Sequence, residues 1–131
     1  MHRLLVINPG STSTKVAVFE DEQPLFVETL RHSSQDIAAF PHILDQYEFR
    51  LRSVQELLRN RGIQVSSLAA VVARGGLLRP IPSGTYSINK KMVEELGRRD
   101  AEREHASGLG APLAEEIAGL VGVPAFIVDP V

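Results

Sequence analysis

The segment most suited to chemistry is a turn-forming run near the amino terminus. It combines an amide, a glycine for close approach to the backbone, four hydroxyl groups and one ammonium group, in the order Asn8, Pro9, Gly10, Ser11, Thr12, Ser13, Thr14, Lys15. Convergent backbone N–H groups and a positive charge can replace the hydration shell of a phosphate. The run therefore predicts a phosphate-binding hairpin. A tight turn whose hydroxyl groups bond to their own backbone is an equally good interpretation of this segment alone.

Three further positions carry groups that could act on an anion. Arg74 ends a strand-like run and could present its guanidinium to a carboxylate or phosphate, or lie in an exposed loop. His105 precedes a helix-like run, where it could donate to an anion or simply act as a solvated cap. Asp129 follows the last strand-like run, where it could hold hydrated Mg²⁺ or form a turn. With the hairpin, these groups make up the parts of a phosphoryl-transfer site.

Two familiar nucleotide-binding patterns do not fit the chain. The strict Walker pattern is absent, and the loop after the first strand leads into a second strand rather than a helix. Gly108 and Gly110 begin like a dinucleotide fingerprint, but Leu113 follows where a third glycine would stand and no strand precedes them. A phosphate loop here must therefore join two strands. The histidines without an assigned role are His2, His32 and His42.

The elements that must position these groups follow from the apolar pattern. Short apolar or β-branched runs predict strands at 4–7, 15–20, 25–30, 66–73, 86–88 and 125–128. Apolar residues at spacings of three and four predict a helix from 40 to 58, with Pro41 in its first turn and Gly62 as its stop. A second helix is expected from 107 or 108 to 121, stopped by Gly122.

A shorter helix from 90 to about 96 completes the expected elements, with Asn89 as its N-cap. Residues 21–24, which include Pro24, are expected to form a turn. Three strands therefore precede any helix. This order predicts an α/β fold, with a sheet of mixed direction covered by helices.

Length, charge and composition limit the classes of function. The 131 residues carry 14 basic and 16 acidic side chains, so no positive excess favours nucleic acid or an anionic membrane. No apolar run approaches the length of about 20 residues that a membrane span requires. The absence of cysteine excludes disulfides, thiolate catalysis and cysteine metal sites. Without a signal-peptide pattern, the expected location is the cytoplasm, with no nucleic-acid or membrane partner.

Five segments, in order and spread over almost the whole chain, carry a resemblance to a known family. They are 7–15, 73–76, 82–86, 104–107 and 126–131. Together they resemble the amino-terminal part of the butyrate kinases, in the acetate and butyrate kinase family of the actin-like, sugar-kinase ATPase superfamily. The resemblance implies an actin-like ATPase (ribonuclease H-like) domain over residues 1–131, with three antiparallel strands first and helices packed on the sheet. Family enzymes are more than twice as long, so a second domain with the adenosine pocket is expected to be absent from this chain.

By this resemblance the reaction is reversible transfer of the γ-phosphoryl group of ATP to the carboxylate of a short-chain fatty acid such as butyrate. The products are an acyl phosphate and ADP, and Mg²⁺ is the implied cofactor. Ser13 and Lys15 would lie in the phosphate-binding hairpin. No general base is needed, because a carboxylate nucleophile is already ionised at neutral pH.

The resemblance gives individual roles to four other residues. Asn8 would lie near the metal and the transferring phosphate, and Arg74 would hold the acyl carboxylate and the γ-phosphoryl group. His105 would donate to phosphoryl oxygens in the transition state, and Asp129 would organise Mg²⁺ through water. The family also implies a homo-oligomer for the complete enzyme, and little activity for a chain without the second domain that closes over the nucleotide.

The pattern departs from the family at one position, where Gly108 replaces an asparagine. Glycine there either loosens the loop that carries His105 or serves as a tolerable helix cap. Preference among butyrate, acetate, propionate and branched acids also stays open, because one methylene changes affinity by only about 1 to 3 kcal/mol. The alternative to an enzyme is a non-catalytic half-kinase that binds an anion or serves in assembly.

Overall fold

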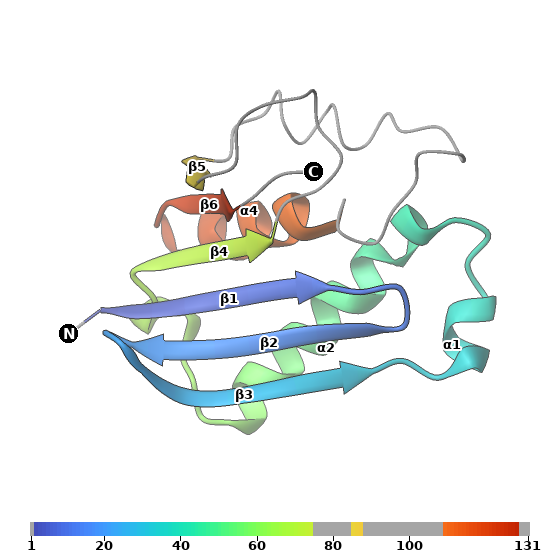
Figure 1. Ribbon diagram of the computed structural model, residues 1–131, viewed down its shortest axis with the longest axis horizontal. Coiled ribbons are helices and arrows are strands. Elements are labelled where there is room, and N and C mark those ends of the chain that lie inside the picture. Colours follow the sequence, from blue (N-terminus) through green and yellow to red (C-terminus); the bar gives the residue numbers. More distant parts are fainter. Residues whose placement is uncertain (1, 75–84, 88–108, 129–131) are drawn as a thin grey trace.

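A mixed sheet forms the frame of the computed structural model, which describes residues 2–74, 85–87 and 109–128. Within that part of the chain the sheet has six strands in the order β3-β2-β1-β4-β6-β5 (Figure 1). The strands are β1 (Arg3–Pro9), β2 (Ser13–Glu20), β3 (Gln23–Arg31), β4 (Ala70–Arg74), β5 (Thr85–Ser87) and β6 (Ala125–Val128).

The direction of the strands changes at the centre of this sheet. The first three strands pair antiparallel, β1 with β2 and β2 with β3. On its other side β1 pairs parallel with β4, which pairs parallel with β6, while β5 is antiparallel to β6. The predicted fold class is confirmed: a mixed sheet with three antiparallel strands first and helices packed on it.

The helices are α1 (Ser34–Ala38), α2 (Tyr47–Asn60) and α4 (Gly110–Val121), with short 3₁₀ turns η1 (Ile43–Gln46) and η2 (Val65–Ser67). Figure 1 shows α2 and α4 behind the sheet, on the same side. The core lies between the two helices and that face, and its fully buried members include Leu5, Ile7, Val16, Val18, Val54, Val71, Leu113 and Ile117. Since successive strand residues face opposite sides, the alternate positions Leu5 and Ile7 both reach this core. Among the helices of the described residues, none combines the length and apolar content that a membrane crossing requires.

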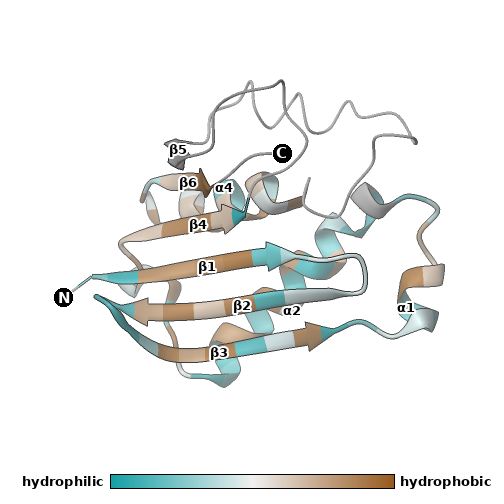
Figure 2. Ribbon diagram, viewed as in Figure 1, coloured by the Kyte–Doolittle hydropathy of each residue, from teal (hydrophilic) through white to brown (hydrophobic). Residues whose placement is uncertain are grey.

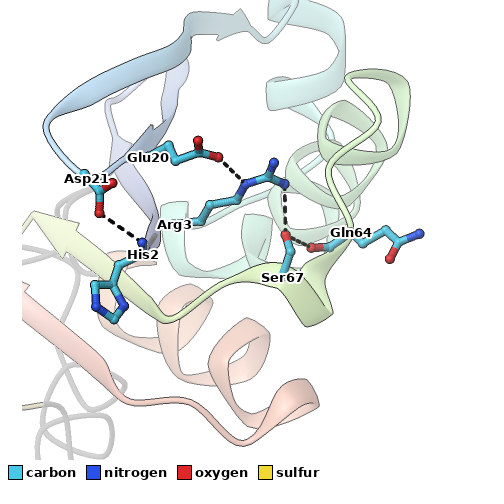
Figure 3. A network of polar contacts seen from close by, with 6 residues as sticks. All are labelled: His2, Arg3, Glu20, Asp21, Gln64 and Ser67. Atoms are coloured by element: carbon cyan, nitrogen blue, oxygen red, sulfur yellow. Dashed lines mark hydrogen bonds and ion pairs between the residues drawn. The ribbon is translucent and has the colours of Figure 1, made fainter.

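A polar network lies at the end of the sheet where β1 begins (Figure 3). Arg3 donates to Glu20 at 3.0 Å and to the hydroxyl of Ser67 at 3.3 Å, and that hydroxyl donates to the carbonyl of Gln64. The network ties the start of β1 to the end of β2 and to η2. Figure 2 shows mainly apolar segments along β1 and β4, and both strands turn polar at their carboxyl ends.

The helix predicted from residue 40 begins at Tyr47, so the expectation that Pro41 lies in its first turn was wrong. Proline disfavours the helical conformation of the residue before it, here Phe40, and the chain instead forms α1 and then η1 before α2. Phe40 still packs near the helix, with its ring 5.9 Å from that of Phe49. The predicted stop is confirmed, since Gly62 follows the helix with a φ of 72°.

Other boundaries differ by smaller amounts. The strand predicted at 66–73 begins only at Ala70, because η2 occupies the residues before it. Pro24 lies inside β3 rather than in a turn; β3 is an edge strand, where a missing N–H is tolerated. β5 lies one residue earlier than predicted, at Thr85–Ser87, and α4 begins at Gly110 rather than at 107 or 108. The helix predicted at 90–96 falls outside the described residues.

Candidate active site

The fold brings the ends of the predicted site segments to one edge of the sheet. β1, β4 and β6 are parallel neighbours, so their carboxyl ends lie together. Ile7 pairs with Ala73, which makes Asn8 and Arg74 the next residues on two adjacent strands. Arg74 in turn pairs with Val128. The side chain of Arg74 is exposed, as a ligand-binding guanidinium at this edge requires.

The first turn of α4 reaches the same edge. A Cβ atom at Gly110 would lie 2.7 Å from the carbonyl oxygen of Arg74 and 3.7 Å from Cδ of Pro9. This close approach explains the glycine that resembled part of a dinucleotide fingerprint: it lets a helix pack directly on the end of β4. The hairpin, Arg74 and the start of α4 therefore converge.

Two predicted catalytic residues, His105 and Asp129, lie outside the described residues, as does Gly108. Asp129 directly follows Val128, the residue that pairs with Arg74, and His105 precedes the start of α4 by a few positions. Their roles stay predictions.

The segment predicted to bind phosphate forms the expected hairpin loop between two strands. β1 ends at Pro9 and β2 begins at Ser13, and the N–H of Gly10 donates to the carbonyl of Ser13 at 2.7 Å. A Cβ at Gly10 would meet the hydroxyl oxygen of Ser13 at 3.2 Å, a close contact that a rotation of the Ser13 side chain could relieve. Ser11 and Thr12 are exposed at its tip. Lys15 is also exposed, one position before buried Val16 on β2.

A residue that the sequence analysis missed holds this loop from below. Arg50, in α2, is fully buried; its Nη1 donates to the carbonyls of Gly10 at 2.6 Å and Ser13 at 2.9 Å. Its Nη2 donates to the carbonyl of Ser11 at 3.1 Å, and Nε and Nη2 both donate to Oε1 of Gln46. Arg50 stands four positions before buried Val54, but no local signal distinguishes it from the exposed Arg52 of the same helix.

His32 completes the support of the loop. Its backbone N–H donates to the carbonyl of Thr12 at 2.9 Å, and its Nε2 lies 2.9 Å from the hydroxyl oxygen of buried Thr14. Burial lowers the pKa of His32, the charge of Arg50 lowers it further, and Asp36 acts in the opposite direction. The imidazole is therefore neutral at neutral pH and serves as a structural partner of the loop.

Together these contacts turn the carbonyls of the loop inward. All four oxygens, those of Gly10, Ser11, Thr12 and Ser13, accept hydrogen bonds from Arg50 or His32. Within the part of the chain that the structure describes, the N–H groups of Ser11 and Thr12 have no hydrogen-bond acceptor. Free N–H groups beside cationic Lys15 are what an anion-binding loop needs. The arrangement fits the predicted phosphate site, which stays a prediction.

A divalent cation would find few protein ligands here. No group of three or more His, Cys, Asp or Glu side chains that could hold a metal occurs in the described ranges. Asn8, half-buried at the end of β1, offers one amide oxygen. Mg²⁺ usually keeps several waters and binds through one or two carboxylates and substrate phosphates. Asn8 therefore fits a Mg²⁺ site only together with Asp129, water and the phosphates of a nucleotide.

Comparison with known proteins gives a consistent result. No family model matches the chain. It is 53% identical over all 131 residues to Butyrate kinase 1 of Clostridium acetobutylicum and covers 37% of that protein. The chain thus spans little more than a third of the length of this relative. The resemblance to the amino-terminal part of a butyrate kinase is confirmed.

Solved structures share the fold at much lower identity. Acetate kinase from Porphyromonas gingivalis matches with a TM-score of 0.62 and 15% identity, covering 98% of this chain and 37% of that one. A propionate kinase from Francisella tularensis subsp. tularensis matches with a TM-score of 0.57 and 17% identity, covering 98% of this chain and 36% of that one. These matches identify the actin-like ATPase fold.

Proposed function

Because all 131 residues are similar to part of a butyrate kinase, we propose that the chain is the amino-terminal part of a carboxylate kinase. The enzyme transfers the γ-phosphoryl group of ATP reversibly to a short-chain fatty acid such as butyrate, giving an acyl phosphate and ADP. The 53% identity over the whole chain carries the proposal. The hairpin, with inward carbonyls and outward N–H groups, supports it physically.

In this proposal the chain binds and aligns the reacting groups. The N–H groups of Ser11 and Thr12, with Ser13 and Lys15, hold phosphate oxygens, and Gly10 keeps the loop tight. Arg74 holds the fatty-acid carboxylate against the γ-phosphoryl group. A carboxylate oxygen bonds to the γ-phosphorus, and the bond from that phosphorus to the bridging oxygen breaks, with its electron pair leaving on ADP. Such catalysis depends mainly on alignment and charge stabilisation.

The remaining roles belong to His105, Asp129 and Asn8. His105 donates a hydrogen bond to the phosphoryl oxygens as charge develops in the transition state. Asp129, through water, and Asn8 would hold Mg²⁺, and the ion would neutralise phosphate charge. No residue need take a proton from the nucleophile, because the carboxylate is already ionised.

The proposal also covers the context of the chain. Residues 1–131 form the amino-terminal actin-like ATPase domain, and a second domain supplies the adenosine contacts. The complete enzyme is a cytoplasmic homo-oligomer that acts on small molecules, with no nucleic-acid or membrane partner. The 131-residue chain alone has little turnover, because water exclusion and nucleotide binding need both domains.

The test compares the natural gene product with the 131-residue chain. The intact mass of the gene product is measured, and ATP-dependent acyl phosphate formation is assayed with butyrate, acetate, propionate and branched acids. We expect a longer, active gene product and an almost silent 131-residue chain. Normal activity of the short chain would refute the need for a second domain. A gene product of this length without activity would favour a non-catalytic anion-binding or assembly module.

Arg74→Ala provides the residue-level test of this activity. The variant should lose most of its kcat/KM, because the guanidinium is proposed to stabilise both reacting groups. Arg52→Ala is the matched control, since the side chain of Arg52 is 80% exposed on α2 and its ion pair among the described residues is with Glu48. Near-normal kcat/KM of the Arg74→Ala enzyme would refute the role of this residue.

A further inference from the structure

Arg50 is a buried cation whose partners are all neutral. Its acceptors are backbone carbonyls of the hairpin loop, the amide oxygen of Gln46 and, at 3.3 Å, the hydroxyl of Thr14. None of the ion pairs between described residues includes it. Burial lowers the pKa of Arg50, yet a guanidinium stays charged near neutral pH. Burying such a charge without a counter-charge costs free energy, so a purely structural role does not explain an arginine at this position well.

The hydrogen bonds of Arg50 also set the direction of the loop N–H groups. In a trans peptide the C=O of one residue and the N–H of the next point in opposite directions. The described chain has no cis peptide bond. The inward carbonyl of Gly10 therefore turns the N–H of Ser11 outward, and the inward carbonyl of Ser11 does the same for Thr12. The exposed side of the loop is left with donors and a buried positive charge beneath them.

We propose that Arg50 is a positioning residue for the transferring phosphate: it holds the carbonyls of Gly10 and Ser11 inward, so that the N–H groups of Ser11 and Thr12 face the phosphate. The bound phosphate supplies the negative charge that Arg50 lacks within the described protein. This inference rests on the proposed function, since it assigns Arg50 to the same phosphate site.

The first test uses the full-length protein and three variants. Arg50→Lys keeps the charge but loses the planar fork that reaches several carbonyls at once. Arg50→Met removes the charge, and Arg52→Lys is the control on the exposed side of the same helix. The readouts are the unfolding midpoint, the affinity for inorganic pyrophosphate by calorimetry, and the separate KM values for ATP and butyrate.

We expect Arg50→Lys to fold and to bind pyrophosphate about 10- to 100-fold more weakly, because a small misplacement of binding groups costs about that much. The KM for ATP should rise or kcat fall, while the KM for butyrate changes little. Arg50→Met should weaken pyrophosphate binding further, and Arg52→Lys should match the wild type. A folded Arg50→Lys enzyme with wild-type pyrophosphate affinity and kcat would overturn the inference, even if its unfolding midpoint had dropped.

A second measurement does not depend on the stability of any variant. In amide NMR spectra of the wild-type protein, added pyrophosphate should shift the Ser11 and Thr12 N–H signals; unchanged signals at saturating pyrophosphate would overturn the inference. The outcomes also separate the two proposals. A wild type that binds pyrophosphate through Arg50 but makes no acyl phosphate would refute the kinase function alone. An active kinase whose affinity for pyrophosphate is the same in the wild type and in the Arg50 variants would refute the positioning role alone.

Discussion

Adding one methyl group at Gly110 should disturb the carboxyl end of β4, which carries Arg74, more than the size of the methyl group suggests. The new Cβ would lie 2.7 Å from the carbonyl oxygen of Arg74 and 3.1 Å from Cβ of Ala73. Both atoms belong to β4 at or next to its backbone, so no flexible side chain can move aside. The amino-terminal end of α4 must instead retreat from the strand that carries Arg74.

The expected cost follows from these distances. Favourable non-bonded carbon contacts lie at about 3.5 to 4.0 Å, so the helix start must move by roughly half an ångström or more. Overpacking of this kind costs about 1 to 3 kcal/mol, and the better helix propensity of alanine returns at most about 1 kcal/mol. Gly119 is the matched control in the same helix, because a Cβ there would meet nothing within 4 Å. Gly119→Ala should stabilise the protein by up to about 1 kcal/mol.

The two alanine variants of the full-length protein would be compared by thermal unfolding and by kcat/KM for acyl phosphate formation. Gly110→Ala should unfold at a lower temperature than the wild type and lose activity, because the end of β4 shifts with the helix. Gly119→Ala should unfold at a higher temperature with unchanged kinetics. If Gly110→Ala were as stable as Gly119→Ala, the close packing of α4 on β4 would be refuted.

Three further outcomes are expected. Burial and the charge of Arg50 lower the pKa of His32, and Asp36 opposes them only in part. The folded protein therefore binds this proton less readily than the unfolded chain. The wild type should lose stability as the pH falls below the ordinary histidine value of about 6.5, by up to about 1.4 kcal/mol per pH unit. Urea titrations at pH 7 and pH 5 should show a smaller loss for His32→Gln; equal losses would contradict this. Ser33→Ala removes the hydroxyl that accepts from the Asp36 N–H at the start of α1, and should lower the free energy of unfolding by about 1 kcal/mol, with kcat as the unchanged control. Asp129→Asn should reduce the Mg²⁺-dependent rate, whereas an unchanged magnesium profile would return Asp129 to turn formation.

The elements governed by local pattern were predictable from sequence. The apolar runs of β1, β2 and β3 come before any helical periodicity, which was enough to predict three strands first. Gly62 and Gly122 ended their helices as expected, because glycine adopts a φ near 70° without the steric cost that a Cβ atom imposes. The helix α1 was not predicted, because its five residues are too few to show a period.

What the sequence could not reveal depends on contacts between distant segments. Arg50 lies on a helix whose other charged residues are solvated, and only the packing of α2 beneath the hairpin shows that this one is buried. Gly110 likewise gains its meaning from Arg74, on a strand that precedes it by more than thirty positions. Pro41 marked a break that the apolar period of the long helix concealed.

The bonds between Arg50 and the hairpin loop also bear on when this loop can form during folding. β1 and β2 are adjacent in sequence, so their hairpin has a short loop to close and can form early. The bond from Arg50 to Gly10 spans 40 positions, and the loop cannot take its final shape until α2 has docked. The hairpin loop therefore takes its final shape through a contact between distant parts of the chain. A ligand that binds only the finished loop stabilises the docked helix by mass action, and so favours the completed core over partly folded forms.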